Sequence, residues 1–496
     1  MKKILLLIPL IVLMLSCSQK HPSAEIAIPL KEHPRPDFER SPWQNLNGYW
    51  QFAPDSANIG EAKNWQENPD AFTSKILVPF SWASPLSEIT LPKLNIGWYA
   101  RRFNIGRDSG WKGKNVFIIF VASDFHTQVW INGQFAGEHK GGYVPFEFDI
   151  TSFIKGGNNR LVVRVEDEEL DNRPSGKQYY GNAKGIWQTV YLEPRNEVHL
   201  SSIRFTPDID KSEVRAEINL SAPAPEGLQF RLAGKGNDIV FESSLGAGDT
   251  ASRFTVPVSD MKLWTLNDPY LYEVTASLVS KKIIDSVNTY FGMRKISAVT
   301  IPGKEFQYVA LNNEPLYLRL TLDQSYHPEG FYTFPSDEFI RDEIMRAKNI
   351  GLNGLRIHIK AEIPRKLYWA DKYGLLIMED VPNFWGEPTP EAKANWEYIA
   401  ECEIMRDYNH PSIFSWVLFN ETWGLFTRDT ATRRRSYTPE TQDWVRSWYH
   451  KTKALDPSRL VEDNSPCNLD HVITDLNTWH SYNPARQWSG LFDEIV

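Results

Sequence analysis

Short apolar runs alternate with helical segments after about residue 304, and this alternation constrains the fold more than any other feature of the chain. The runs lack the polar–apolar alternation of half-exposed strands, which is typical of a parallel sheet covered by helices. Ser336 is the expected N-cap of the first helix, and Gly351 its stop. We expect strands at 315–322, 352–359, 375–380, 412–419, 459–464 and about 472–480, and helices at 335–351, 363–374, 390–409 and 439–456.

Two topologies fit this pattern, a doubly wound sheet and a (β/α)8 TIM barrel. No Gly-rich phosphate loop follows any of the strands, which counts against nucleotide-binding forms. In a TIM barrel, active sites lie at the carboxyl ends of the strands.

Polar, charged and aromatic residues collect where the six expected strands end. Carboxylates, a cation, amides and indoles at one edge suit a carbohydrate pocket, because aromatic faces stack on sugar rings. The residues are Asp323, Tyr326 and His327; Arg356 and His358; Glu379, Asp380 and Trp385; Asn420, Glu421 and Trp423; Glu462, Asp463 and Asn464; and Trp479, His480 and Tyr482.

The preceding half of the chain is rich in short strands separated by turn residues. Residues 41–195 are expected to form a β-sandwich of the jelly-roll kind, with a hairpin at Asn132-Gly133. Residues 196–300 repeat the pattern at immunoglobulin-like length, without the cysteine pair of antibody domains. Residues 301–496 would then form the partial barrel.

The N-terminus predicts export. Lys2 and Lys3 precede 12 apolar residues, too few for a permanent span. The run ends in Leu15-Ser16-Cys17, which resembles a bacterial lipobox; an ordinary secretory signal with an incidental cysteine is the alternative. We expect residues 1–17 to be a lipoprotein signal peptide and 18–40 a tether. A lipid on Cys17 would be the only membrane attachment of a periplasmic or outer-membrane-associated protein.

Composition excludes several other classes. The net charge is −8, and the only basic run is Arg433-Arg434-Arg435, so nucleic acid is not an expected partner. Three cysteines make no disulfide framework and lack metal-ligand spacing. We expect no metal and no cofactor, and the sequence leaves a homo-oligomer open.

The motifs in order resemble glycoside hydrolase family 2, the β-galactosidases, β-glucuronidases and β-mannosidases. The stretches SPWQNLNGYWQF, VWINGQFAGEHKGGYVPFEFDIT and GKQYYGNAKGIWQTVYLE resemble its sugar-binding jelly roll. LWTLNDPYLYEV with YFGMRKI resembles its immunoglobulin-like domain, and NIGLNGLRIH and LFNETWG resemble its TIM barrel. The resemblance implies a retaining hydrolase of terminal β-linked sugars, of galactoside or glucuronide type, acting on glycans.

Residue roles follow from the same resemblance. Glu421 would be the general acid/base, and Asn420 the amide that binds the sugar 2-hydroxyl. Arg356 would support the nucleophile by its charge, with a structural salt bridge as the alternative. Further substrate contacts, each as plausible as a structural role, are expected from His358, Asp323, Asp380, Trp423, His480 and Tyr482.

Two stretches leave questions open. IHIKAEIP follows Arg356 where the family often has a Ser-His-Tyr-Pro-like stretch, so the sugar is not identified. The loop 166–178 is expected to be solvated, although Asp167 and Lys177 are alternatives for substrate contact.

A retaining mechanism needs a second carboxylate, which the family places on strand seven. The strand count puts that residue past Val496, so the chain is expected to be a fragment and its own activity is uncertain. One competing hypothesis has Asp463 or Asp380 as the second carboxylate. Another is a lipid-anchored carbohydrate-binding protein with an inactive barrel.

Overall fold

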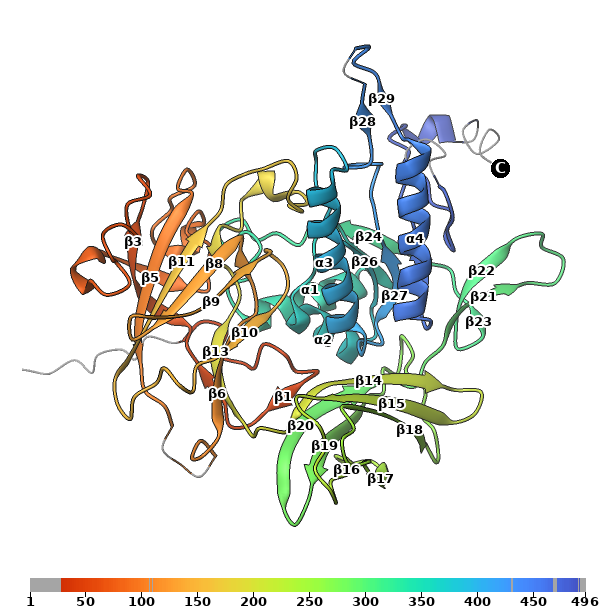
Figure 1. Ribbon diagram of the computed structural model, residues 1–496. Coiled ribbons are helices and arrows are strands. Elements are labelled where there is room, and N and C mark those ends of the chain that lie inside the picture. Colours follow the sequence, from red (N-terminus) through yellow and green to blue (C-terminus); the bar gives the residue numbers. More distant parts are fainter. Residues whose placement is uncertain are drawn as a thin grey trace, which may run out of the picture.

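The computed structural model describes residues 28–106, 108, 110–429, 431–466, 471–488 and 490. The expected signal peptide with Cys17, the start of the tether and Cys467 lie outside these residues. Three bodies follow one another along the chain: a β-sandwich, a smaller β-sandwich and a helix-covered parallel sheet (Figure 1).

The first sandwich contains two main sheets that share one apolar core. Trp50, Phe52, Tyr99 and Phe120 lie in this core, each at most 1% exposed. One sheet has the order β4-β3-β5-β11-β8-β9, the other β10-β6-β13-β2, and β12 pairs with β7. The strands are β2 Gln44–Asn45, β3 Gly48–Pro54, β4 Ser74–Val78, β5 Ile96–Phe103, β6 Asn115–Phe120, β7 Ser123–Asp124, β8 His126–Ile131, β9 Gln134–Lys140, β10 Phe146–Asp149, β11 Asn159–Glu166, β12 Gly185–Ile186 and β13 Val190–Arg195, with short 3-10 turns at Pro69–Ala71, Pro85–Ser87 and Gln178–Tyr180.

The predicted hairpin at Asn132-Gly133 is confirmed. Ile131 of β8 pairs directly with Gln134 of β9, so the loop has two residues. Asn132 and Gly133 both have positive φ, 53° and 84°, which a two-residue turn of this kind requires and which Asn and Gly tolerate.

The second sandwich packs a five-stranded sheet, β1-β20-β19-β16-β17, against a three-stranded sheet, β14-β15-β18. Phe230, Leu232, Val274 and Val287 lie in the core between them. The strands are β1 Glu39–Arg40, β14 Leu200–Asp208, β15 Glu213–Leu220, β16 Gln229–Gly234, β17 Val240–Ser244, β18 Ala251–Pro257, β19 Tyr272–Val279 and β20 Ile283–Phe291.

The third body is a parallel sheet in the order β24-β25-β26-β27-β30, with one helix in each of its four connections. Each helix starts at a residue that suits its N-terminus: Ser336 caps α1, Thr389 caps α3, Thr438 caps α4, and Pro364 opens α2. The elements are β24 Leu320–Asp323, α1 Asp337–Asn349, β25 Gly354–Ile357, α2 Pro364–Tyr373, β26 Leu376–Asp380, α3 Pro390–Asp407, β27 Ile413–Val417, α4 Pro439–Leu455 and β30 Leu460–Glu462.

These elements confirm an incomplete barrel, with one correction to the expected strand count. The sequence predicts a sixth strand at about 472–480, but these residues run as irregular chain. Asp463 fixes this segment instead, since its carboxylate accepts the backbone N–H groups of Val472 and Ile473. Backbone groups tied to a side chain are not available for a strand ladder, so the described sheet has five strands.

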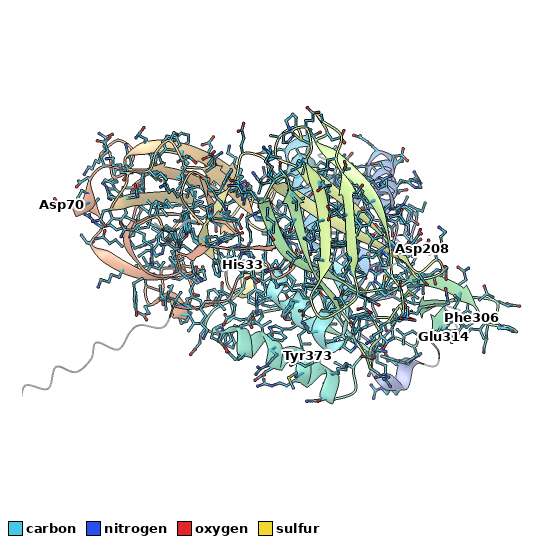
Figure 2. All side chains as sticks on the ribbon, turned by 90° about the horizontal axis from the view of Figure 1, so that it is seen from below. His33, Asp70, Asp208, Phe306, Glu314 and Tyr373 are labelled. Atoms are coloured by element: carbon cyan, nitrogen blue, oxygen red, sulfur yellow. The ribbon has the colours of Figure 1, made fainter. Side chains whose placement is uncertain are left out.

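Part of the expected tether is packed rather than free. Glu39 and Arg40 form β1 at the edge of the second sandwich. Arg40 is 3% exposed and binds both Glu193 and Asp285, which joins the two sandwiches. His33 is also buried, and Figure 2 labels it well inside the outline of the molecule.

Two small additions project from the bodies. The sheet β21 Ile296–Thr300, β22 Gln307–Leu311 and β23 Glu314–Pro315 forms an arm, labelled in Figure 2 at Phe306 and Glu314. A hairpin of β28 Thr427–Arg428 and β29 Arg435–Ser436 rises above the barrel between β27 and α4 (Figure 1), and a short 3-10 turn lies at Ala485–Gln487.

Within the part of the chain that the structure describes, none of the helices has the length and hydrophobicity needed to span a membrane.

Candidate functional site

Arg356 is the centre of the polar cluster at the carboxyl ends of the strands. Its guanidinium binds Asp380 through two nitrogens, at 2.9 Å from Nε and 2.8 Å from Nη2. The same group donates to the Asn420 Oδ1 oxygen at 2.8 Å and the Ser465 hydroxyl at 2.8 Å. Arg356 is 8% exposed, so one buried cation fixes side chains from β25, β26 and the segments after β27 and β30.

Glu421 lies in a turn whose backbone is held in an unfavourable conformation. Its φ is 50° and that of Thr422 is 61°, the left-handed region that costs free energy for residues other than glycine. Neighbouring groups stabilise the turn, because the Glu421 N–H donates to the Ser465 carbonyl and the Thr422 N–H to Asn464 Oδ1. The sequence therefore ends an apolar strand and aims a carboxyl group out of it.

The Glu421 carboxyl group accepts two hydrogen bonds at one oxygen. His480 Nδ1 lies 2.7 Å from Oε1, and the Tyr482 hydroxyl lies 2.9 Å from the same atom. The other ring nitrogen of His480, Nε2, faces an Arg356 N–H at 3.2 Å and therefore accepts. Nδ1 therefore carries the N–H and donates a hydrogen bond to Glu421, and this arrangement fixes the tautomer of the ring.

A chain of hydroxyls links this pair to a second, buried carboxyl group. The Ser465 hydroxyl lies 2.9 Å from His480 Nε2 and 3.1 Å from the Thr478 hydroxyl. Thr478 in turn donates to Glu462 Oε1, at the end of β30. Burial raises the pKa of Glu462 to about 7, since the carboxylate form loses its hydration there.

Aromatic rings form a wall beside Glu421. The Trp385 and Trp423 rings lie 4.5 Å apart at 30°, and the His358 ring meets Trp423 edge-on at 5.9 Å. Trp385 is 40% exposed, so part of its side chain is accessible to a ligand. This arrangement suits stacking on a sugar ring.

The loop after β11 reaches this wall, which corrects the expectation that it is solvated. Lys177 Nζ lies 5.2 Å from the centre of the Trp423 ring. The backbone of the loop docks on the barrel: Gly176 donates to the Asn383 carbonyl and accepts from the Trp385 indole. Asp167 is buried, and burial raises its pKa to about 6. Lys177, a side chain of the first sandwich, thus contributes to the site in the third body.

Two buried nitrogens in the site make no hydrogen bond within the described part of the chain. They are Asn420 Nδ2 and His358 Nδ1. Burial, together with the charges of Arg356 and Lys177, lowers the pKa of His358 to about 2, so its ring is neutral. A buried donor without a partner costs about 1–3 kcal/mol, and a polyol ligand would supply acceptors.

Asp323 does not join this cluster. Its carboxylate binds the Lys366 ammonium at 2.7 Å and accepts the Ser325 N–H at 2.7 Å. Asp323 was expected as a substrate contact, but the buried charge of Lys366 turns it towards the helix α2. Asp380 is 1% exposed and paired with Arg356, so it positions that cation rather than facing a ligand directly.

A groove of about 650 Å³ opens beside Glu421. It is lined by Asp171, Asn172, Trp385, Gly386, Glu387, Thr389, Glu421, Thr422, Trp423, Gly424, Phe426, Arg428 and Arg435. A second cavity of about 400 Å³, lined partly by the loop 167–179, shares Trp385 and Asp171 with it.

The sequence pattern does not indicate Ser465 and Thr478 as parts of the site, and it gives Lys177 only as an alternative for substrate contact. Ser465 and Thr478 carry no charge, and Thr478 lies within the stretch expected as the sixth strand, so nothing in the pattern singles them out. Among the described residues, no group of three His, Cys, Asp or Glu side chains is arranged to hold a metal ion.

Three family models match the chain in order. The model described as "Glycosyl hydrolases family 2, sugar binding domain" matches residues 43–193, "Glycosyl hydrolases family 2" matches 198–294, and "Glycosyl hydrolases family 2, TIM barrel domain" matches 305–487.

Individual relatives agree with these models. A β-galactosidase of Thermoanaerobacter pseudethanolicus is 31% identical over 353 residues, covering 66% of this chain and 45% of that protein. A putative β-glucuronidase of Formosa agariphila is 28% identical over 468 residues, covering 90% of this chain and 53% of that protein. The chain thus spans about half the length of these curated relatives.

Solved structures give the same architecture. The β-glucuronidase from Ruminococcus gnavus in complex with D-glucuronic acid superposes with a TM-score of 0.71 at 20% identity, covering 85% of this chain and 72% of that chain. At this identity the likeness establishes the fold.

Proposed function

Because the chain belongs to glycosyl hydrolase family 2, we propose that it is a retaining β-glycosidase that removes terminal galactose-type or glucuronic-acid-type sugars from glycans. The observation that carries the proposal is the Glu421 carboxyl group, aimed by a strained turn, bound by His480 and flanked by Trp423. A carboxyl group in such a place donates a proton to a departing glycosidic oxygen and then activates water. Named relatives act on galactosides and glucuronides, which supports these two sugars.

Each neighbour of Glu421 has a role in the proposed reaction. His480 and Tyr482 hold Glu421 Oε1, so the rotation of the carboxyl group is fixed. Asn420 has a free donor, Nδ2, for the 2-hydroxyl, while its oxygen is fixed by Arg356. A hydrogen bond at that hydroxyl strengthens in the oxocarbenium-like transition state.

The nucleophile in this proposal is a carboxylate outside the described residues. Asp380 is engaged by both nitrogens of Arg356, and Asp463 is engaged by His471 and two backbone N–H groups. A nucleophile must instead approach the anomeric carbon directly, with its carboxyl group about 5 to 5.5 Å from the acid/base.

In the full-length natural protein, hydrolysis of aryl β-glycosides by wild type, Glu421→Gln and Glu226→Gln tests the proposal. We expect Glu421→Gln to lose activity on poor leaving groups by about 10²–10⁴-fold. It should lose much less on 2,4-dinitrophenyl glycosides, whose leaving group needs no protonation, and added azide should trap a β-glycosyl azide. Glu226→Gln, at an exposed position of the second sandwich, is the control.

Two results would overturn the proposal. Equal losses on good and poor leaving groups would mean that Glu421 does not protonate the leaving group. Sugar binding without turnover of any aryl glycoside would favour a carbohydrate-binding protein with an inactive barrel.

We also propose that the protein is exported and attached to the bacterial envelope through a lipid on Cys17. The support is the sequence Leu15-Ser16-Cys17 after a short apolar run. Labelling of cells with a radioactive or clickable fatty acid tests this; wild type should be labelled and Cys17→Ala should not. Label on both would overturn it.

A further inference from the structure

The groove beside Glu421 has a cationic end that the proposed reaction does not use. The two-stranded hairpin of β28 and β29 supplies this end through Arg428 and Arg435, which both line the groove. Figure 1 shows the hairpin projecting above the barrel; in the chain it lies between β27 and α4.

The hairpin concentrates positive charge in eight residues. Arg428, Arg433, Arg434 and Arg435 are all exposed. Arg428 pairs directly with Arg435 across the two strands, so their side chains leave the same face. None of the ion pairs between described residues involves any of these four arginines. The single acidic residue of the hairpin, Asp429, is occupied in the turn, where it accepts the N–H groups of Ala431 and Thr432.

Like charges placed opposite each other on adjacent strands are destabilising, and a shared anion offsets that cost. Guanidinium groups bind sulfate and carboxylate through two parallel hydrogen bonds. The other ionisable residues of the groove are the acidic Asp171, Glu387 and Glu421, which lie in the β11 loop, after β26 and after β27, so positive charge is confined to the hairpin. With a chain net charge of −8, this patch is local and not part of a basic surface.

The aromatic wall lies in the same groove. Trp385, with 40% of its surface exposed, contacts Trp423, which is two residues after Glu421, with the two rings tilted by 30°. When the glycosidic bond breaks, the leaving sugar takes the proton of Glu421 and would therefore contact the indole rings. The sugars attached to this leaving sugar would contact the arginines.

We propose that this groove binds the leaving-group side of an anionic β-linked glycan, with Arg428 and Arg435 contacting its sulfate or uronate groups. The inference rests on the proposed hydrolase function, because Glu421 is what makes this the leaving-group side. It extends that function by assigning negative charge to the part of the substrate on the leaving-group side of the cleaved bond.

Calorimetric titration of the full chain with three hexasaccharides tests the proposal: cellohexaose, 6-O-sulfated cellohexaose and its 6-carboxylated counterpart. We expect at least one anionic form to bind about tenfold or more tightly than cellohexaose, as two charge-assisted contacts would give, and to weaken as salt rises. The double variant Arg428→Gln/Arg435→Gln should lose most of this preference.

A matched control removes the same charge elsewhere. Lys281→Gln/Lys282→Gln changes two exposed residues between β19 and β20 and should keep the preference. A preference for the sulfated form alone identifies sulfate as the anion, and one for the carboxylated form alone identifies uronate. Equal binding of all three sugars, or equal losses in both double variants, would overturn the proposal.

The outcome is separable from the proposed function. Turnover of neutral aryl glycosides by wild type tests only the role of Glu421, while the titrations test only the groove. Absence of turnover with an intact anionic preference would overturn the reaction and leave the binding site; the reverse would overturn the binding site alone.

Discussion

His480 Nδ1 lies 2.7 Å from Oε1 of Glu421, while the other nitrogen of the same ring accepts from Arg356. One imidazole thus connects the proposed acid/base to the buried cation that organises the strand ends. Because Arg356 sets the histidine tautomer, the donor that faces Glu421 is fixed by a residue on another strand.

Replacing His480 should affect the pH dependence more than the affinity. His480→Ala removes an N–H donor that favours the charged form of the Glu421 carboxyl group, so the basic limb of the kcat/KM profile should move to higher pH. Tyr482→Phe removes the second donor, which is 85% exposed, and should shift the limb less. Profiles on an aryl glycoside measure this; a limb that stays in place in both variants would contradict it.

Arg356→Met should destabilise the barrel severely. The change leaves Asp380 buried at 1% exposure without its counter-charge, a loss of about 3–5 kcal/mol in the free energy of unfolding. Arg356→Lys keeps the charge but not the two-nitrogen contact, so its free energy of unfolding should lie between those of wild type and Arg356→Met. Urea unfolding, followed by tryptophan fluorescence, measures both.

The control for this prediction is Arg346→Met, an exposed arginine on α1. It should change the free energy of unfolding by less than about 0.5 kcal/mol, as surface substitutions do. Equal losses at positions 346 and 356 would show that the buried pair has no special role.

The raised pKa of the buried Glu462 carboxyl group should make the free energy of unfolding depend on pH. Its pKa rises from 4.5 to about 7 on folding, so between these values the folded protein binds more protons than the unfolded chain, and stability falls as pH rises. Glu462→Gln is neutral at every pH and keeps an oxygen for Thr478. At pH 8 it should exceed wild type by at most about 3 kcal/mol, and below pH 4 the difference should vanish.

Unfolding curves of wild type and Glu462→Gln at pH 4, 6 and 8 check this prediction. Glu387→Gln, in an exposed position, serves as the control and should show no such trend. A Glu462→Gln advantage that is the same at all three values would mean that the titration of Glu462 is not its cause.

Asn464 should be needed to hold the Glu421 turn. Asn464→Ala removes the acceptor of the Thr422 N–H and the donor to the Thr422 hydroxyl, at a cost of about 1–3 kcal/mol. With its turn no longer braced, Glu421 should relax from φ 50°, and kcat should fall more than KM rises.

Asn464→Asp is the matched variant, because it keeps the acceptor for Thr422 while it replaces the donor by a carboxyl group. It should retain more of the wild-type kcat than Asn464→Ala. The same kcat in both variants would show that the backbone hydrogen bond does not position Glu421.

Local sequence patterns were sufficient for most of the architecture. Unalternating apolar runs predicted the parallel strands β25, β26, β27 and β30, because burial on both faces leaves that mark on the sequence. Ser336, Gly351 and Asn132-Gly133 marked element ends correctly, since caps and tight turns depend on a few adjacent residues.

The expected sixth strand shows where local patterns mislead. The stretch 472–480 has strand-like composition, but Asp463 binds its first backbone N–H groups and holds it as irregular chain. A side chain eight or more residues away competes with the ladder, and composition does not record that competition.

The sequence by itself determined the order of the three bodies, the position of Glu421 at a strand end and the polar character of the strand ends. Only the tertiary structure decided which of those end residues meet. It brings Arg356, Asn420, Ser465 and His480 together, turns Asp323 away to Lys366, and places Lys177 of the first sandwich over Trp423. The physical reason is that hydrogen bonds and ion pairs act over a few ångströms in space, between residues up to 246 positions apart in the chain (177 and 423).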